Sequence, residues 1–399
     1  MGLRSIKEIF ITGHGPSSSH TMGPYFACQY ILKKYKDIKF IEVTLFESLA
    51  LTGKGHLTDF IIDKALKDVD HQIIFDKKTR TKHPNTMSFK VVTSDKEYRE
   101  NVVSIGGGSI VTVDNFQELN NQDVYPHRHM SEIVEYCQAN DISFYDYVTK
   151  FEGEEIYNYF KDVLKVMDEA FERGLKAEGV LPGKLQVKRK AKAMHDAMED
   201  TIHAENDVAM NVAIASFAVA EENAAGGIIV TAPTCGSAGV IPGCIKYLRM
   251  KGVSDENIIK GLAVAGLFGI VCKMNASVSG AECGCQAEIG VACSMGAAMI
   301  AFCFGKDIID IVQSAEIALE HSLGLTCDPV DGYVQIPCIE RCAIYAIKAI
   351  NAVKLAIVIP NDDIHVSYDD SIRTMYKTGL DMNEKYKETS LGGLAEFIK

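Results

Sequence analysis

The sequence predicts an α+β protein, with a mixed α+β domain over residues 1–128 and a larger all-α domain over residues 129–399. A chain of 399 residues exceeds the usual size of one domain. Alternation of apolar and polar residues, the pattern of half-buried strands, is confined to the first part of the chain. From residue 207 onward Ala, Met, Val and Gly leave little polar face, which is typical of helices surrounded by other helices.

The first domain is predicted to contain four strands and two helices. The strand segments are rich in branched and aromatic residues, and they lie at residues 38–46, 72–75, 88–93 and 102–113. Helical spacing of apolar residues is found at residues 20–36 and 57–68. The glycine run 106–108 indicates a tight turn.

The second domain begins after a polar stretch at residues 120–129, where strand signals fade. An amphipathic helical pattern covers residues 143–177 and is broken by GVLPG at residues 179–183. Later helices are interrupted by three Gly- and Pro-bearing segments: TAPTCGSAGVIPG, SGAECGCQ and LTCDPVDGYVQIPC. Because breaks buried in a helical core are where sites are often built, these segments are candidate site elements.

Composition, charge and the N-terminal residues favour a cytoplasmic protein over a nucleic-acid-binding or membrane protein. Acidic residues outnumber basic ones, 53 to 41, and no Lys/Arg-rich run of the kind that follows a phosphate backbone stands out. Lys7 and Glu8 come too early for a secretory hydrophobic segment, and Ile6 breaks the myristoylation pattern. The longest apolar stretch, residues 261–272, is far shorter than the roughly 20 residues of a membrane-spanning helix, so a buried helix is expected there.

A first candidate site is GPSSSHTMGP at residues 15–24, where Ser17, Ser18, Ser19, His20 and Thr21 precede an apolar helical pattern. Ser and Thr at this place are typical of an ordinary helix start. Alternatively, the hydroxyls, the helix-terminal N–H groups and His20 converge on an anion such as a substrate carboxylate.

A second candidate is LTGKGHLTD at residues 51–59, which presents Lys54 and His56 between glycines. The glycines are consistent with a simple turn. A glycine loop also lets a side chain approach a substrate closely, and an imidazole near neutral pKa suits proton abstraction.

The cysteines form the third candidate, since ten of the twelve lie between Cys235 and Cys342. Free cysteines often act as small buried hydrophobic residues, and this composition does not suit a disulfide framework. Cys283 and Cys285, however, lie in a Gly-containing break, Cys327 precedes Asp328-Pro329, and Cys338 follows Pro337, so that Gly and Pro neighbours remove these thiols from a helix interior. Their spacing is neither a zinc CxxC pair nor a ferredoxin pattern, so spacing alone leaves metal binding open.

Taken together, these segments resemble the iron-sulfur-dependent L-serine dehydratases of bacteria, in a single-chain form. The resemblance rests on the order of motifs along the chain: SSSHT, SLALTGKGH, SIGGG, EGVLPG, EENAAGG, TAPTCGSAG, KMNASVSGAECGCQAEIGVACSM, LGLTCDPV, QIPCIER and KYKETSLGGLA. It implies a lyase that converts L-serine to pyruvate and ammonia, with the active site at the interface of the two domains and without pyridoxal phosphate.

The resemblance also implies roles for individual residues. A 4Fe-4S cluster with one open iron would be held by Cys285, Cys327 and Cys338, which stand in the family motifs GCQ, LTCDP and IPCIER. The residues of the first candidate site would bind the substrate carboxylate, and His56 or Lys54 would remove the α-proton. Asn275 and Ser277 would hydrogen-bond substrate or cluster sulfur, or else be polar residues of a helix end.

Several departures from the family pattern leave the substrate open. Cys235, Cys283 and Cys342 add thiols, Glu47 stands where Gly is usual, and the chain ends at Lys399 without the cysteine tail of some members. β-Elimination from L-threonine or L-cysteine is therefore an alternative. Rival classes are a pyridoxal-phosphate enzyme, a non-catalytic iron-sulfur redox sensor and a cysteine-rich structural or zinc protein. By analogy with the family a homodimer is expected, and an effector site on the first domain is left open.

Overall fold

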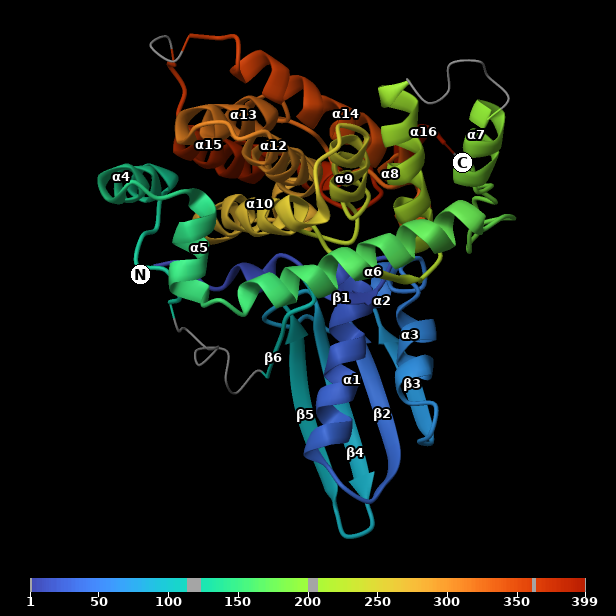
Figure 1. The fold of residues 1–399 in the computed structure, drawn as a ribbon. Coiled ribbons are helices and arrows are strands. Elements are labelled where there is room, and N and C mark those ends of the chain that lie inside the picture. Colours follow the sequence, from blue (N-terminus) through green and yellow to red (C-terminus); the bar gives the residue numbers. More distant parts are fainter. Residues whose placement is uncertain (1, 113–122, 200–206, 361–363, 399) are drawn as a thin grey trace.

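The computed structural model describes residues 2–112, 123–199, 207–360 and 364–398. Its N-terminal part contains a five-stranded sheet of order β3-β2-β4-β5-β6, which projects from the helical part of the molecule (Figure 1). The strands are β2 (Ile38–Phe46), β3 (His71–Asp76), β4 (Thr86–Thr93), β5 (Glu97–Ser104) and β6 (Ile110–Thr112). β2 pairs with β3 in parallel, and the other neighbours pair antiparallel.

One face of this sheet packs on helices α1 (Gly23–Lys34) and α3 (Thr58–Ala65). Alternate residues of β2, namely Ile41, Val43 and Leu45, are fully buried in the same cluster as α1 residues such as Ile31. The period-two pattern that predicted the strand therefore marks the side of β2 that meets the helices.

The predicted strand at residues 102–113 is two strands, which is a correction to the sequence analysis. β5 and β6 pair with each other across a turn in which Gly106, Gly107 and Gly108 all have positive φ. Glycine adopts this left-handed conformation without the steric cost that other residues incur. Residue 113 lies outside the described residues. β5 also begins at Glu97, five residues before the predicted start of the strand at residue 102. Its first five residues alternate between exposed and half-buried positions, so they lack the apolar residues that marked the strand in the sequence.

The second part of the chain is largely helical, as predicted. Its core helices are α8 (Val208–Ala224), α9 (Val240–Met250), α10 (Asp255–Asn275), α12 (Val291–Cys303), α13 (Ile308–Glu320) and α14 (Cys338–Ala356). They are surrounded by α4 (Met130–Asn140), α5 (Phe144–Glu152), α6 (Ile156–Lys176), α7 (Ala191–Glu199) and α15 (Tyr368–Asp381). The predicted helix 143–177 is divided into α5 and α6 at Gly153, which has a φ of 84°.

Two apolar segments, α10 and Gln286–Cys303, are long enough to cross a membrane by length and composition alone. In the structure, 78% and 83% of their most apolar windows are buried inside the protein. Residues 261–272 belong to α10 and are all buried, which confirms the expected buried helix. Burial among other helices accounts for their composition as it does for core helices of soluble proteins.

The two parts of the chain are interwoven near the N-terminus. β1 (Thr12–His14) pairs antiparallel with β7 (Ile228–Val230), which is the one strand among the described residues of the helical part. Leu3, Ile6 and Phe10 are buried in the helical core together with Tyr125. Residues 2–14 therefore pack with the helices although they precede the sheet, and the division at residue 128 stays a prediction.

Candidate active site

A cavity of about 220 Å³ lies where the sheet-bearing part meets the helical part. Ser17, Ser18 and Ser19 line it from the N-terminal side, together with Gly106 and Gly107 of the β5–β6 turn. The helical part contributes Thr234, Ser277, Glu288, Glu388 and the cysteines Cys285, Cys327 and Cys338. The structure thus brings the serines and the three predicted cysteines to one cavity.

The serine loop continues into η2 (Ser18–Met22), a short π-helical turn that leads into α1. Ser17 is its N-cap, because its hydroxyl accepts the His20 backbone N–H at 3.2 Å. The Ser18 hydroxyl accepts the Cys235 backbone N–H at 2.8 Å, which ties the loop to the helical part. The Ser18 hydroxyl also forms a hydrogen bond with the side chain of Cys235, which opposes the rise in the pKa of that thiol.

Thr21 lies behind this loop and does not line the cavity. Its buried hydroxyl accepts the Ser17 N–H at 3.1 Å and donates to the backbone oxygen of His56 at 2.7 Å. The structure therefore gives Thr21 the position of a link between the serine loop and the histidine loop.

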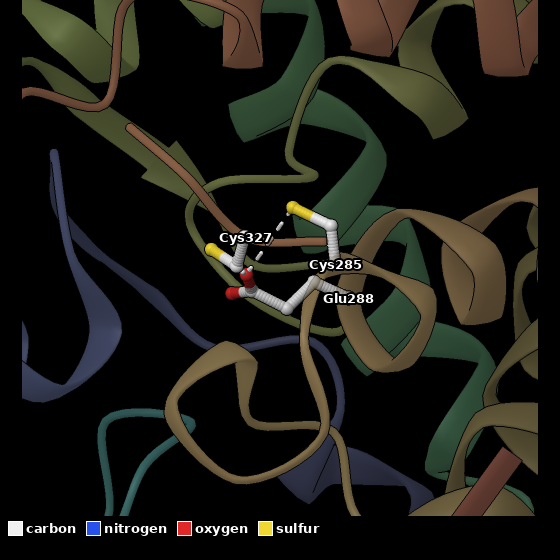
Figure 2. Close-up of side chains that lie close together, drawn as sticks. All are labelled: Cys285, Glu288 and Cys327. Carbon is white, nitrogen blue, oxygen red and sulfur yellow. Dashed lines mark hydrogen bonds between the residues drawn. The ribbon is translucent and has the colours of Figure 1, made fainter. Parts of the chain in front are cut away.

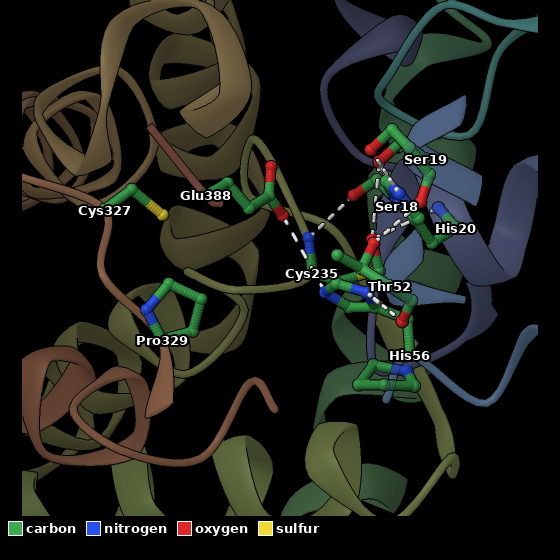
Figure 3. Close-up of polar contacts among 12 residues, drawn as sticks. Ser18, Ser19, His20, Thr52, His56, Cys235, Cys327, Pro329 and Glu388 are labelled. Atoms are coloured by element: carbon green, nitrogen blue, oxygen red, sulfur yellow. Dashed lines mark hydrogen bonds and ion pairs between the residues drawn. The ribbon is translucent and has the colours of Figure 1, made fainter. Parts of the chain in front are cut away.

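His20 and His56 lie against each other, with ring centroids 4.6 Å apart (Figure 3). His20 is buried, and its two ring nitrogens contact the hydroxyls of Ser19 at 2.8 Å and Ser48 at 3.0 Å. Burial, with a further contribution from His56, holds the pKa of His20 well below its usual value, so the ring is neutral at pH 7.

His56 is fully buried and carries a lone pair without a hydrogen-bond partner. Its Nδ1 lies 3.1 Å from the carbonyl oxygen of Thr52, so Nδ1 holds the proton and Nε2 is the basic nitrogen. Among the described residues, Nε2 has no hydrogen-bond partner, and it lies 3.9 Å from Oε1 of Glu388. Burial lowers the pKa of His56 to about 4. Glu388 lines the cavity, whereas His56 does not.

Lys54 is not brought to this cavity. Its side chain is exposed, and its ammonium lies over the ring of Phe75 on β3, 5.5 Å from the centroid. Of the two bases that the sequence predicts, only His56 is adjacent to a residue that lines the cavity.

A compact group of Cys285, Glu288 and Cys327 forms the opposite wall, with one ligand atom of each within 4.8 Å of the others (Figure 2). Oε2 of Glu288 lies 3.9 Å from Sγ of Cys285 and 3.8 Å from Sγ of Cys327. Oε1 accepts a hydrogen bond from the hydroxyl of Thr234 at 2.8 Å. Cys338, the first residue of α14, lines the same cavity.

The cysteines of this wall, Cys285, Cys327 and Cys338, form no disulfide and lie near the charged side chains of Glu288 and Arg341. All twelve cysteines are unpaired and eleven are buried, and this includes all three cysteines of the cavity. Burial and the neighbouring Cys285 raise the pKa of Cys338, while the guanidinium of Arg341 opposes that rise. Many buried cysteines and a Cys-Glu-Cys group are compatible with a metal cluster.

Asn275 and Ser277 stand in different settings. The Asn275 amide is engaged with Arg128, accepting from Nε at 2.9 Å and donating to the backbone oxygen at 2.8 Å. Ser277 lines the cavity and accepts the Ser279 N–H at 3.1 Å. Asn275 therefore supports the end of α10, and only Ser277 is presented to a ligand.

Glu288 and Glu388 are the acidic site residues that sequence reasoning missed. Both stand inside motifs that the resemblance uses, CQAEIG and KYKETS, but a glutamate in a helical or exposed-looking segment gives no signal of its own. Arg4 and Lys273 also line the cavity, and both pair with Glu8, at 3.3 Å and 3.0 Å.

The extra thiols lie at or near the wall without lining the cavity. The Cys235 backbone holds Ser18, and Cys342 contacts the Gly236 oxygen through Sγ at 3.3 Å. Burial raises the pKa of both thiols to about 12. Glu47 adopts a φ of 40°, a conformation that favours glycine, and its carboxylate accepts the Thr81 backbone N–H at 2.6 Å.

Comparison with known proteins assigns the whole chain to one family. The family model described as serine dehydratase beta chain matches residues 5–67, and that described as serine dehydratase alpha chain matches residues 70–395. The chain is 38% identical to the L-serine dehydratase of Haemophilus influenzae and 39% identical to L-serine dehydratase 2 of Escherichia coli, with 98% of each chain covered in both cases. It is 38% identical to an L-serine dehydratase of Helicobacter pylori over 99% of both chains.

The alignment with the H. influenzae protein spans 448 positions, 49 more than the 399 residues of this chain. At least 49 residues of that relative therefore have no counterpart here. The match nevertheless covers 98% of this chain, so it includes both the sheet-bearing and the helical part. The chain belongs to the serine dehydratase family.

Proposed function

We propose that this protein is an L-serine ammonia-lyase, a carbon-oxygen lyase that converts L-serine to pyruvate and ammonia. The observation that carries the proposal is the single cavity in which a serine loop faces three free thiols. Membership in the serine dehydratase family supports the substrate, and the small cavity volume suits an amino acid of this size.

The cofactor that we propose is a 4Fe-4S cluster held by Cys285, Cys327 and Cys338. These residues fit such a group, because all three thiols line one cavity and none is engaged in a disulfide. Gly280 supports the fit, since a side chain there would meet Glu288 Oε2 at 2.4 Å and Cys327 Sγ at 3.2 Å. When bound, a cluster with an open iron supplies a Lewis acid for the β-hydroxyl, which is otherwise a poor leaving group.

The serine loop would orient the substrate through its carboxylate. Ser17, Ser18 and Ser19 line the cavity, and a serine hydroxyl can donate a hydrogen bond to a carboxylate. Thr21, which sequence analysis placed among the ligands, would instead position this loop relative to His56. Ser277 would contribute from the other side, and His20 would fix the Ser19 hydroxyl.

We assign removal of the α-proton to His56. Its neutral Nε2 has an unused lone pair, and the Thr52 carbonyl holds the ring in the required tautomer. The His56 ring is fully buried, and Oε1 of Glu388 lies 3.9 Å from its Nε2. The Glu388 side chain must therefore turn away from His56 before Nε2 can reach the α-proton of a bound substrate. Loss of the α-proton and of the β-hydroxyl as water gives aminoacrylate, which tautomerises and is hydrolysed to pyruvate and ammonia.

Three further expectations accompany this proposal: a cytoplasmic enzyme of amino-acid degradation that feeds gluconeogenesis, a homodimer, and a small-molecule partner rather than nucleic acid or membrane. L-Threonine and L-cysteine are the alternative substrates, since Cys235 and Cys342 lie beside the wall of the cavity. Relative rates on the three amino acids distinguish them, and we expect L-serine to be preferred.

The test is pyruvate formation from L-serine by protein that is purified anaerobically, exposed to air, and then reconstituted with iron and sulfide. We expect activity to be lost in air and to return on reconstitution, because thiolate-bound clusters are sensitive to oxygen. Reconstituted protein that carries the cluster but forms no pyruvate would exclude the dehydratase and would favour a redox sensor. Activity that needs pyridoxal phosphate and no iron would exclude the cofactor.

A further inference from the structure

Glu388 is held over the cavity by a short C-terminal segment that pairs with the segment carrying Cys327. The Cys327 N–H donates to the Tyr386 oxygen at 2.8 Å, and the Glu388 N–H donates to the Cys327 oxygen at 2.8 Å. The Ser390 hydroxyl donates to the Pro329 oxygen at 2.7 Å. Glu388 and Ser390 have φ values of 59° and 58°, so the backbone adopts a costly conformation at both residues. These contacts fix the backbone from which the Glu388 side chain extends.

That carboxylate is buried without a cation. Its side chain is 15% exposed, and its one ion-pair contact within 4.0 Å among the described residues is Nε2 of His56, which is neutral at pH 7. Burial, and after it repulsion from Glu288, raises the pKa of Glu388 to about 8, and a hydrogen bond from the Ala281 backbone opposes this rise. A cation beside Glu388 would favour its ionised form, and the position of this side chain on the cavity wall, next to His56, points to a cationic ligand group.

The other charged groups of the cavity wall already have partners or face elsewhere. Glu288 is bonded by Thr234 and directed at Cys285 and Cys327. Glu282 is exposed. The cations Arg4 and Lys273 both pair with Glu8. Glu388 is the carboxylate that lies between the serine loop, His56 and the thiols (Figure 3).

We infer that Glu388 binds the α-ammonium group of the amino-acid substrate. This assignment rests on the proposed function, in which the substrate carries an ammonium group, a carboxylate and a β-hydroxyl on two adjacent carbons. The serine loop would take the carboxylate and the wall with the thiols would face the hydroxyl. The ammonium then points to the remaining wall, where an ionic hydrogen bond to Glu388 would complete the recognition.

The separation of Glu388 and His56 suits this role. The ammonium nitrogen and the α-hydrogen are both bonded to Cα, so the protein group that binds the ammonium and the group that takes the α-proton must be close neighbours. Oε1 of Glu388 and Nε2 of His56 are 3.9 Å apart. If the Glu388 carboxylate turns away from His56 to bind the ammonium group, Nε2 of His56 is left uncovered. The bound ammonium then holds the α-hydrogen near that nitrogen. Glu388 thereby selects amino acids over the corresponding carboxylic acids.

The experiment compares binding of L-alanine and propanoate, which differ only in the ammonium group and lack a hydroxyl to eliminate. Calorimetric titrations use anaerobic, cluster-loaded wild type, Glu388→Gln and the matched control Glu282→Gln, whose carboxylate is at the cavity rim and exposed. In the wild type and in the control we expect L-alanine to bind about 10- to 100-fold more tightly than propanoate, the range of a charge-assisted hydrogen bond. In Glu388→Gln the two affinities should become nearly equal.

A Glu388→Gln protein with unchanged iron content that keeps the wild-type ratio of affinities would overturn the assignment. Glu388→Asp retains the charge and should keep most of the preference for L-alanine; a complete loss there, with propanoate binding intact, would also contradict it. Because neither ligand is turned over, these outcomes are independent of pyruvate formation. Failure of the proposed function would appear instead as wild-type protein that is loaded but inactive on L-serine.

Discussion

The two walls of the cavity differ in how completely their polar groups are paired within the protein. On the N-terminal side, Ser17, Ser19, His20 and Thr21 form a continuous set of hydrogen bonds that extends to the His56 loop. On the helical side, Cys285, Cys327 and Cys338 form no disulfide, and the thiols of Cys285 and Cys327 have only long contacts with Glu288. Among the described residues, Glu388 has no Lys or Arg partner within 4.0 Å. The first wall is organised by the fold itself, whereas the second is suited to be completed by a metal group and a substrate.

The largest effect should come from the unpaired wall. Cys327→Ser removes one of the three thiols, and we expect loss of bound iron and sulfide together with loss of measurable pyruvate formation. Iron analysis and the rate are measured on the same anaerobic sample. The control is Cys137→Ser, in α4 and outside the cavity, which should keep both. Full iron content in Cys327→Ser would remove Cys327 from the ligand set.

His56→Ala should reduce kcat about 10²- to 10⁴-fold, the usual contribution of a general base, while the iron content stays at the wild-type level. Steady-state rates and iron analysis together check this. A variant with wild-type rates would exclude His56 as the base.

Burial of His56 also predicts a dependence of stability on pH. The folded pKa of about 4 lies below the unfolded value of about 6.5, so the unfolded chain binds more protons between these values. Stability is then fully present above pH 6.5 and falls by about 3 kcal/mol from this residue as pH drops to 4. Urea unfolding at several pH values measures it, and His56→Gln should show a shallower decline. Equal declines in both proteins would contradict the burial argument.

Thr21→Val tests the paired wall. It removes two buried hydrogen bonds of the hydroxyl, so unfolding should cost about 1–3 kcal/mol less, with the catalytic loss smaller than for His56→Ala. Thr149→Val removes a hydroxyl bonded only within α5, to the Tyr145 oxygen, and serves as the control for urea unfolding. A Thr21→Val protein as stable as that control would show that the link between the two loops is unimportant.

The smallest effect is expected at Lys54. Lys54→Ala changes an exposed side chain that contacts Phe75 rather than the cavity, so kcat and KM should stay within about twofold of the wild type. A large fall in kcat would return Lys54 to consideration as the base and would question the position of its loop.

Much of the fold followed from periodicity, because residues such as Ile41, Val43 and Leu45 alternate along one buried face. The glycine run 106–108 indicated a turn but not that the chain continues there as a second, antiparallel strand. The break at Gly153 was missed because helical spacing of apolar residues is found on both sides of it. The pairing of β1 with β7 joins segments more than 200 residues apart, which no local pattern reports.

The candidate site could be predicted only in part from the sequence, because local patterns do not report contacts between distant segments. Cys285, Cys327 and Cys338 stood out through their Gly and Pro neighbours and through family motifs, and the structure brings them to one cavity. Glu388 depends on a positive φ and on a backbone bond to Cys327, both of which are properties of the folded chain. Lys54 and His56 belong to the same loop, but the Lys54 side chain extends to Phe75 and the His56 side chain to Glu388. The sequence does not show in which direction each side chain points.

The most direct measurement of the central claim is the rate of pyruvate formation as a function of cluster content. Anaerobic protein is reconstituted to a series of iron and sulfide contents, and the initial rate with saturating L-serine is measured for each sample. Our account predicts a rate that rises in proportion to cluster content and extrapolates to zero without it. A rate that is substantial in cluster-free protein, or that does not change as the cluster content rises, would contradict the account.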